Sequence, residues 1–307
     1  MNRYQKIVIT GSSGWLGSET AELLIDSIGL DILNRLTLIT SIPRVVHLRG
    51  VIIKTFGWED FKRLTNVDLL IHFAFLNQEK AHEIGFPRYI ESNRRITSDV
   101  NWVLHANPGC DLIVASSGAV EHFSPDISSA NSFEVYSALK QESEKSILSN
   151  SSLGALLIVR IWNVTGSRLR IEAPYAVSNL FKQGIEEGRI ILIGNSMSTR
   201  TYVDVKEMML IFLLCLSEST DHIMNSGGFT TKIGELATKI GRQLNLSHGS
   251  IKFNGENCKI DAYVPKVEPF NAFARVFGVK LSDIDTQIHL LHQSFQNHRL
   301  SESREIT

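Results

Sequence analysis

The sequence predicts a doubly wound α/β protein, in which helices cover both faces of a parallel β-sheet and a smaller lobe lies toward the C-terminus. Three observations support this fold class. Short runs of Ile, Val and Leu recur between longer mixed segments, a glycine-rich turn directly follows the first run, and the alternation becomes less regular after Gly166. Parallel strands that are covered on both faces have such continuous apolar runs.

Five apolar runs are expected to form the strands of this sheet, because each has the length and the composition of a buried strand. They are Lys6–Thr10, Leu36–Thr40, Val67–Ala74, Leu112–Ser116 and Leu156–Arg160. Among the segments between them, Glu19–Ile28 is expected to form the first helix. Ser132–Ser149 is expected to form a later helix with an apolar and a charged face.

A glycine-rich turn joins the first expected strand to the first expected helix. Gly11 allows a tight turn, Gly14 lets the backbone approach a pyrophosphate, and Gly17 lets the helix pack closely on the strand. The N-terminal end of the helix then faces the anion with its partial positive charge. The sequence therefore predicts a dinucleotide-binding site that contains Gly11, Ser13, Gly14, Trp15, Leu16 and Gly17.

The end of the second expected strand indicates which dinucleotide binds. Proteins that bind NAD commonly have Asp or Glu about 20 residues after the glycines, where the carboxylate binds the ribose 2′-hydroxyl. The segment from Leu38 to Arg44 contains no carboxylate, and Arg44 can pair with a 2′-phosphate. We therefore expect NADP(H) rather than NAD(H). The alternative is that Arg44 is a solvated loop residue.

Tyr136 and Lys140 form a Tyr-x-x-x-Lys pair, which places both side chains on one face of a helix. A free phenol has a pKa of ~10, but a nearby ammonium favours the phenolate. At ~5 Å and an effective dielectric of ~20, the attraction is roughly 3 kcal/mol, equivalent to about two pKa units. Tyr136 is thus predicted to act as an acid or base near neutral pH, although this spacing also occurs on ordinary exposed helices.

Ser117 follows the fourth expected strand, at the edge of a parallel sheet where ligands bind. A hydroxyl at this place can donate a hydrogen bond to a substrate oxygen. Serine-rich strand ends are often only turns, but the glycine turn and the Tyr-x-x-x-Lys pair occur in the same chain. The sequence therefore predicts Ser117, Tyr136 and Lys140 as catalytic residues.

Along nearly its whole length the chain resembles the extended short-chain dehydrogenase/reductase family, particularly the members that act on nucleotide-linked sugars. The glycine turn matches the family's cofactor loop, and Ser117, Tyr136 and Lys140 match its catalytic triad. The further matching segments are Ile71-His72-Phe73-Ala74 near the cofactor, Asn93, Arg160-Ile161-Trp162-Asn163-Val164-Thr165-Gly166, and Arg200-Thr201-Tyr202-Val203-Asp204-Val205. The resemblance implies a Rossmann-type domain with a C-terminal substrate-binding lobe.

The resemblance also implies a role for the matched residues. Tyr136 would exchange a proton with a sugar hydroxyl or carbonyl while hydride moves to or from the nicotinamide. Ser117 would bind the reacting oxygen, and Lys140 would hold the ribose. Asn163 and Arg200 would position the nucleotide diphosphate of a nucleotide-sugar substrate. A homodimer through the helix that carries Tyr136 and its neighbour is a further implication.

Two positions narrow the expected reaction. The family's sugar dehydratases have Asp and Glu directly after the hydroxyl residue, whereas this chain has Gly118 and Ala119. A dehydratase is therefore not expected. Because Arg44 indicates NADPH, reduction of a nucleotide-linked 4-keto (deoxy)hexose with NADPH is favoured. Epimerisation with retained NAD is the alternative. A catalytically silent, nucleotide-sensing protein is a third hypothesis, and the intact catalytic set counts against it.

Four other residues depart from the family pattern and concern the substrate more than the fold. Glu121 and His122 replace an expected Tyr-Gly pair, and Phe75 is bulky. Phe56 stands close to where an adenine-contacting Asp is common. Phe56 is expected either to stack on adenine or to belong to the core.

The chain is expected to divide close to Gly166. Residues 1–165 are expected to form the dinucleotide-binding Rossmann domain, with segments around 201–225 packing back on it. Residues 166–307 are expected to form mostly the substrate-binding lobe. The nine-residue apolar run Met208–Leu216 is expected to form a buried helix, because a membrane-spanning helix needs about 20 residues.

The composition bounds the possible partners and the location. With 31 basic and 32 acidic residues, a formal net charge of -1 and 43% apolar residues, the chain has the profile of a globular protein. Neither nucleic acid nor a membrane is expected as a partner. The N-terminus lacks a secretory signal, so a cytoplasmic location is expected. Three separated cysteines fit reduced thiols, and no metal site is expected.

Overall fold

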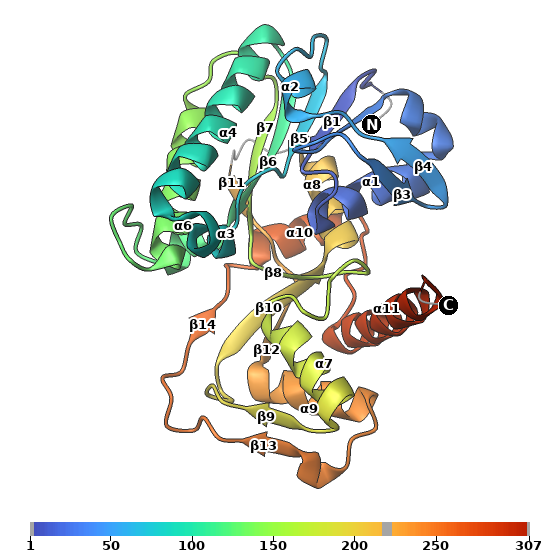
Figure 1. Cartoon of the computed structure of the whole chain (residues 1–307), viewed down its shortest axis with the longest axis vertical. Helices are drawn as coiled ribbons and strands as arrows, with labels where there is room; N and C mark the ends of the chain where they lie inside the picture. The colour runs from blue at the N-terminus through green and yellow to red at the C-terminus, as the bar shows by residue number, and fades with distance from the viewer. Residues whose placement is uncertain (1–2, 217–222, 306–307) are drawn as a thin grey trace. The chain divides into compact units, whose positions relative to one another are not determined.

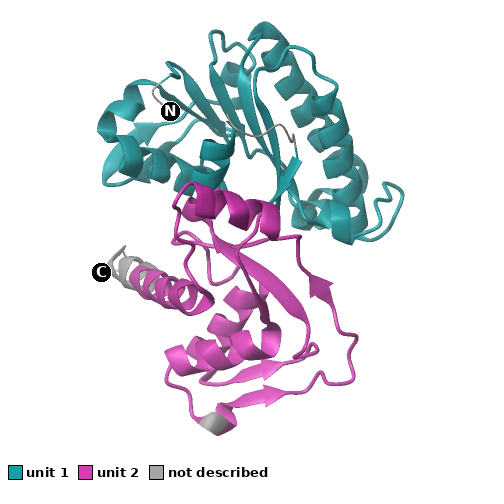
Figure 2. Ribbon diagram, turned by 180° about the vertical axis from the view of Figure 1, so that it is seen from behind, with its two compact units in different colours: residues 1–161, 209–225 teal, residues 162–208, 226–307 magenta. Residues whose placement is uncertain are grey.

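A computed structural model describes residues 3–216 and 223–305 of the chain. The chain forms two compact units (Figure 2). Unit 1 comprises residues 1–161 and 209–225, and unit 2 comprises residues 162–208 and 226–307. The assignment of the cofactor to the N-terminal part and of the substrate to the C-terminal part stays a prediction.

Unit 1 is built on a six-stranded parallel sheet with the strand order β11-β7-β6-β5-β1-β2. This arrangement confirms the predicted doubly wound fold. The five expected runs form strands within two residues of their predicted ends, and β11 is added at one edge. The strands are β1 (Ile7–Thr10), β2 (Leu36–Ile39), β5 (Leu69–His72), β6 (Asp111–Ser117), β7 (Leu156–Ile161) and β11 (Ile223–Asn225).

The strand order creates a point where the chain changes direction across the sheet. β1 lies between β2 and β5, so the chain moves outward on one side of β1 and then continues on the other side. Ligands of open α/β sheets bind at such a switch point, beyond the carboxyl ends of the strands. The glycine turn after β1 and the segment after β5 both lie at this place.

Helices cover both faces of the unit 1 sheet (Figure 1). α1 (Trp15–Ile28) lies on one face, and α4 (Phe86–Ala106) and α6 (Ser132–Leu148) lie on the other. α1 begins one turn earlier than expected, because Gly14 already serves as its N-cap. A hydrophobic core lies between the sheet and the helix pair α4 and α6. Its buried residues include Val8, Leu70, Leu112, Ile158, Val100, Val103 and Ile147.

A β-hairpin that the sequence analysis missed follows β2. It consists of β3 (Val45–Leu48) and β4 (Val51–Lys54) in antiparallel pairing. Arg49 and Gly50, the two turn residues, both adopt positive φ, as tight hairpin turns require. Arg49 also forms an ion pair with Asp26 of α1, which ties the hairpin tip to that helix.

Unit 2 contains a four-stranded sheet and a separate strand pair. β10 (Thr199–Asp204) is antiparallel to β12 and parallel to β8 and β14. β9 and β13 form the separate parallel pair. The other bounds are β8 (Asn163–Thr165), β12 (Phe229–Lys232), β14 (Ala262–Tyr263), β9 (Ile190–Leu192), β13 (Ile251–Phe253), α7 (Ala176–Glu187), α9 (Ile233–Gln243), α10 (Glu268–Val276) and α11 (Ile284–Glu305).

The apolar run predicted as a buried helix forms α8 (Val205–Cys215). Met208, Met209, Ile211 and Phe212 in it are fully buried, which confirms that prediction. No helix among the described residues has the length and apolar character that a membrane span needs. The remaining elements are short and are η1 (Leu30–Asn34), α2 (Trp58–Phe61), α3 (Gln78–Ile84), α5 (Ala119–His122) and η2 (residues 248–250).

Candidate active site

The glycine turn has the geometry that close approach to a phosphate requires. Gly11 adopts a φ of +67°, in the left-handed region that favours glycine. A Cβ at Gly17 would lie 2.4 Å from the carbonyl oxygen of Gly11, so only glycine fits where α1 meets the turn. Gly14 is the N-cap residue of α1, and it has no side chain to accept a hydrogen bond from the N–H groups there. This leaves room for an anion at the helix N-terminus. These residues fit a dinucleotide phosphate.

The other residues predicted for the cofactor loop lie in or beside the first turn of α1. Ser13 is exposed, and Trp15 and Leu16 are half-buried. The indole Nε1 of Trp15 donates a hydrogen bond of 2.9 Å to Glu19 Oε1, which fixes the ring along the helix.

The end of β5 is tied to the glycine turn by a buried hydrogen-bond chain. The Thr10 hydroxyl lies 2.7 Å from Nδ1 of His72 and accepts the backbone N–H of Ala74 at 3.3 Å. Burial, together with the nearby Lys140 charge, lowers the pKa of His72 to about 3, so the imidazole is neutral. Ala74 is thus held against Gly11, where an added Cβ on Gly11 would lie 2.9 Å from Ala74 N.

The residues after β2 flank the glycine turn on the side away from β5, because β1 lies between these two strands. The Thr40 hydroxyl is used within the protein, at 2.8 Å from the Thr55 hydroxyl and 2.7 Å from the carbonyl oxygen of Ile42. Arg44 is exposed, and its guanidinium makes no ion pair within the part of the chain that the structure describes. A 2′-phosphate would therefore find Arg44 accessible.

Phe56 lies beside the end of β2. Its backbone pairs with β2 through the Leu38 carbonyl and the Thr40 N–H, each at 2.9 Å. Its side chain is 52% exposed, so the alternative that Phe56 is a core aromatic is wrong. The exposed ring lies beside the strand end where an adenine is expected.

The structure brings Tyr136 and Lys140 of α6 to the carboxyl end of β6, which ends at Ser117. Lys140 Nζ donates a hydrogen bond of 2.8 Å to the carbonyl oxygen of Ala115. It also lies 3.7 Å from the ring centroid of Phe75 and 5.8 Å from that of Tyr136. The Ser117 hydroxyl is buried and accepts the backbone N–H of Ala119 at 3.2 Å.

The bulky Phe75 is part of this arrangement. Its ring meets the Tyr136 ring edge-on, with 5.9 Å between the ring centroids. The ring also receives the Lys140 ammonium on its face, a favourable cation–π geometry. Phe75 therefore occupies space beside the phenol and limits what else can approach it.

An ion-pair network behind Lys140 was not predicted from the sequence. Arg160 of β7 binds Glu144 through two nitrogens, at 2.9 and 2.6 Å, and the Ser116 hydroxyl donates to the same carboxylate at 2.5 Å. Arg160 also pairs with Glu121 at 2.8 Å. Glu121 thus has a structural partner at a position where the family pattern has tyrosine.

This network affects the charge of Lys140. Burial lowers the pKa of the Lys140 ammonium to about 7, and the negative charge of Glu144 opposes that shift. Glu144 follows Lys140 by one helical turn, so both side chains lie on the same side of α6. In the sequence, the only sign that Glu144 affects the pKa of Lys140 was the four-residue spacing between them.

Asn163 and Arg200, predicted to bind a nucleotide diphosphate, both lie in the sheet of unit 2. The Asn163 side-chain N–H donates to the carbonyl oxygen of Thr201 at 3.2 Å. Arg200 forms an ion pair of 2.7 Å with Asp261 and lies 5.9 Å from the ring centroid of Tyr263. Both residues are thus held in place by their neighbours on adjacent strands.

The three cysteines are free thiols, with Cys110 and Cys215 buried and Cys258 exposed. Within residues 3–216 and 223–305, no three His, Cys, Asp or Glu side chains gather as metal ligands would.

A sequence model of the NAD-dependent epimerase/dehydratase family matches residues 7–227, which is more than two thirds of the chain. The chain belongs to this family. The match includes the glycine turn, the β5 end and the Ser117, Tyr136 and Lys140 set. It confirms the resemblance to extended short-chain dehydrogenase/reductases, a family of NAD(P)-dependent enzymes.

Solved structures of nucleotide-sugar epimerases have the same fold. A UDP-N-acetylglucosamine 4-epimerase from Methanobrevibacter ruminantium, in complex with UDP-N-acetylmuramic acid, aligns with a TM-score of 0.74 and 18% identity over 96% of this chain and 99% of that chain. A Thermotoga maritima UDP-glucose 4-epimerase with UDP-glucose aligns with a TM-score of 0.71 and 13% identity, covering 95% and 99% of the two chains.

A Thermus thermophilus UDP-glucose 4-epimerase in complex with NAD aligns with a TM-score of 0.69 and 16% identity, covering 95% of this chain and 99% of that chain. Identities this low establish the shared fold and not the reaction. A comparison with curated protein sequences found no match.

Proposed function

We propose that this enzyme transfers hydride at a nucleotide-linked sugar without removing water, and that it reduces a 4-keto (deoxy)hexose with NADPH. Ser117, Tyr136 and Lys140 are the proposed catalytic residues. Gly11, Ser13, Gly14, Trp15, Leu16, Gly17, Ala74 and Arg44 are proposed to hold the cofactor. Asn163 and Arg200 are proposed to hold the nucleotide diphosphate.

The bound cofactor supplies the hydride in this reaction. Tyr136 donates a proton to the carbonyl oxygen of the sugar as that oxygen gains negative charge. Ser117 lies at the end of β6 and donates a hydrogen bond to the same oxygen. Lys140, held under Phe75 and the Ala115 carbonyl, provides the positive charge beside Tyr136. Gly118 and Ala119 offer no carboxylate for the elimination of water.

The observation that carries the choice of NADPH is the edge after β2. Thr40 is engaged with Thr55, no carboxylate stands at that strand end, and Arg44 is exposed and makes no ion pair with a described residue. A guanidinium binds a phosphate with two parallel hydrogen bonds, so Arg44 suits the 2′-phosphate that distinguishes NADPH from NADH.

Replacing Arg44 with Ala tests this choice. The Arg44→Ala enzyme is expected to need about tenfold or more NADPH for half-maximal binding, because a charge-assisted hydrogen bond is worth about 1.5–3 kcal/mol. NADH binding is expected to stay within about twofold, and Lys54→Ala on β4 serves as a control. Equal losses for the two cofactors would contradict the proposal.

Epimerisation with retained NAD is the second candidate, because the Thermus thermophilus neighbour is an epimerase in complex with NAD. The two candidates differ in what the purified protein contains. Mass spectrometry of the small molecules released by denaturation is expected to find no stoichiometric NAD, and added NADPH is expected to be oxidised by a keto sugar. One tightly held NAD per chain, with turnover that needs no added reductant, would establish the epimerase instead.

A further inference from the structure

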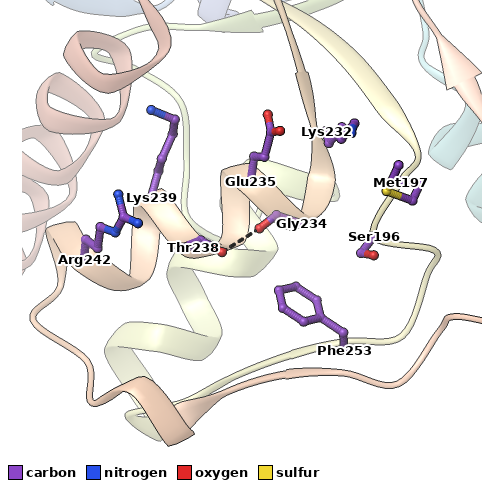
Figure 3. A pocket seen from close by; sticks show the side chains of 9 residues that line it. All are labelled: Ser196, Met197, Lys232, Gly234, Glu235, Thr238, Lys239, Arg242 and Phe253. Carbon is purple, nitrogen blue, oxygen red and sulfur yellow. Dashed lines mark hydrogen bonds between the residues drawn. The ribbon is translucent and has the colours of Figure 1, made fainter.

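A pocket of about 400 Å³ in unit 2 lies outside all the residues assigned above (Figure 3). It is a hollow that is widely open to solvent. The outer face of α9 forms its long side, and the turn after β9 and the last residue of β13 form its end. Its lining is Ser196, Met197, Lys232, Gly234, Glu235, Thr238, Lys239, Arg242 and Phe253.

The end of the pocket is held firmly by hydrogen bonds. The Gly234 N–H donates to the carbonyl oxygen of Ser196 at 2.9 Å. A Cβ at Gly234 would lie 2.9 Å from Ser196 Cβ, so glycine allows the turn to come this close to α9. The Asn195 side chain accepts the Met197 N–H at 2.9 Å and donates to the Cys258 carbonyl at 2.8 Å. This wall is therefore formed before any ligand arrives, which lowers the entropic cost of binding.

The pocket carries an excess of positive charge. Three cations line it against one carboxylate, Glu235. Lys239 is paired with Asp285 at 2.5 Å. Lys232 and Arg242 form no side-chain hydrogen bond or ion pair with any residue that the structure describes. Two cationic groups are thus available to an anion.

The position of Lys232 is unfavourable for α9 itself. Lys232 occupies the N-cap, where an oxygen-bearing side chain normally serves and where the helix end is already partly positive. An anion bound beside Lys232 would relieve this effect.

The pocket also has an apolar surface. Phe253 is 38% exposed and Met197 is 48% exposed, and both lie at the end of the pocket near Gly234. Figure 3 shows the Phe253 ring on one side of the helix and the Glu235 and Lys239 side chains projecting from the other. An aromatic ring and a thioether are good contacts for a flat, polarisable group.

We propose that this pocket binds a nucleotide, with the phosphates paired to Lys232 or Arg242 and the base against Phe253 and Met197. Neither cations nor apolar groups alone would select this ligand class, but the combination does. The site lies entirely within unit 2 and does not depend on the proposed reaction.

ADP is the probe, and calorimetric titration of the whole chain is the measurement. NAD(P) is kept saturating to fill the cofactor site, and Arg200→Ala removes the proposed substrate site. This protein is expected to bind about one ADP per chain. Adding Lys232→Glu and Arg242→Glu is expected to weaken that binding by at least tenfold. Lys252→Glu, an exposed lysine beside Phe253 but outside the lining, is the matched control and is expected to bind ADP normally.

Two further titrations separate the parts of the ligand. Inorganic phosphate and adenosine are each expected to bind at least tenfold more weakly than ADP. Phosphate that binds as tightly as ADP would overturn the nucleotide assignment. Absence of ADP binding in the Arg200→Ala protein, or equal binding after the two charge reversals, would overturn the site. Because the substitutions are at the surface, each variant is expected to fold normally. Circular dichroism checks this.

Discussion

At the residue scale, the candidate site depends on one buried ammonium. Lys140 is 5% exposed and would be expected to lose its charge, because burial penalises a cation. Its contacts offset this penalty: the Ala115 carbonyl, the face of Phe75, and the carboxylate of Glu144 one turn away. His72 on β5 also faces it, but that imidazole is neutral. Glu144 is thus the negative group among these neighbours.

Replacing Glu144 with Gln is expected to lower the pKa of Lys140 below about 7, because the opposing charge is lost. Lys140 is charged only below its pKa. The loss of activity on the alkaline side of the pH profile is therefore expected to move to lower pH. The measurements are the pH profile of kcat and the titration of the Lys140 side chain by carbon-13 NMR.

Glu142→Gln is the matched control, since Glu142 lies on the same helix and pairs with Arg94 at the surface. It is expected to leave both measurements unchanged. An unchanged Lys140 titration in Glu144→Gln would contradict the electrostatic account. A shifted titration with an unchanged activity profile would instead contradict the proposed role of Lys140.

At the element scale, strands and the glycine turn were predictable because their signals are local. The apolar runs reproduced β1, β2, β5, β6 and β7, since buried parallel strands need a continuous apolar sequence. The hairpin of β3 and β4 was missed because its strands alternate and are largely exposed. The ion pair between Arg160 and Glu144 was missed because it joins two elements that are separate in the sequence. In the sequence alone, Glu144 has the pattern of an exposed charge on an amphipathic helix.

The junction of β1 and α1 gives a prediction at this scale. Gly17→Ala places a Cβ 2.4 Å from the carbonyl oxygen of Gly11, so the helix must move away from the turn. Overpacking of this kind costs about 1–3 kcal/mol in unfolding free energy. Cofactor binding is expected to weaken as well, and both effects are measurable by thermal unfolding with and without NAD(P).

Gly194→Ala is the comparison, because a Cβ there meets no atom within 4 Å. It is expected to change neither stability nor cofactor binding appreciably. If Gly17→Ala behaved like Gly194→Ala, the close approach of α1 to the turn would not matter for the site.

At the scale of the whole molecule, the homodimer that the family resemblance implies stays a prediction, and an exposed aromatic residue on α4 allows it to be tested. Trp102 on α4, the helix that packs beside the Tyr136 helix α6, is 67% exposed. Trp102→Glu is expected to shift the protein from dimer to monomer in sedimentation velocity, because a charge replaces a large apolar contact. Val276→Glu, at an exposed apolar residue of α10, is expected to leave the dimer intact. A monomeric wild-type protein would refute the prediction.

In the proposed reaction, Tyr136 supplies the proton while hydride reaches a sugar carbon. The most direct measurement is mass spectrometry of the product formed from a nucleotide-linked keto sugar and NADPH deuterated at the transferring position. The wild-type enzyme is expected to give a product with one deuterium, and Tyr136→Phe is expected to form it about 10²–10⁴-fold more slowly with cofactor binding retained. A product without deuterium, or an undiminished rate in Tyr136→Phe, would contradict the claim.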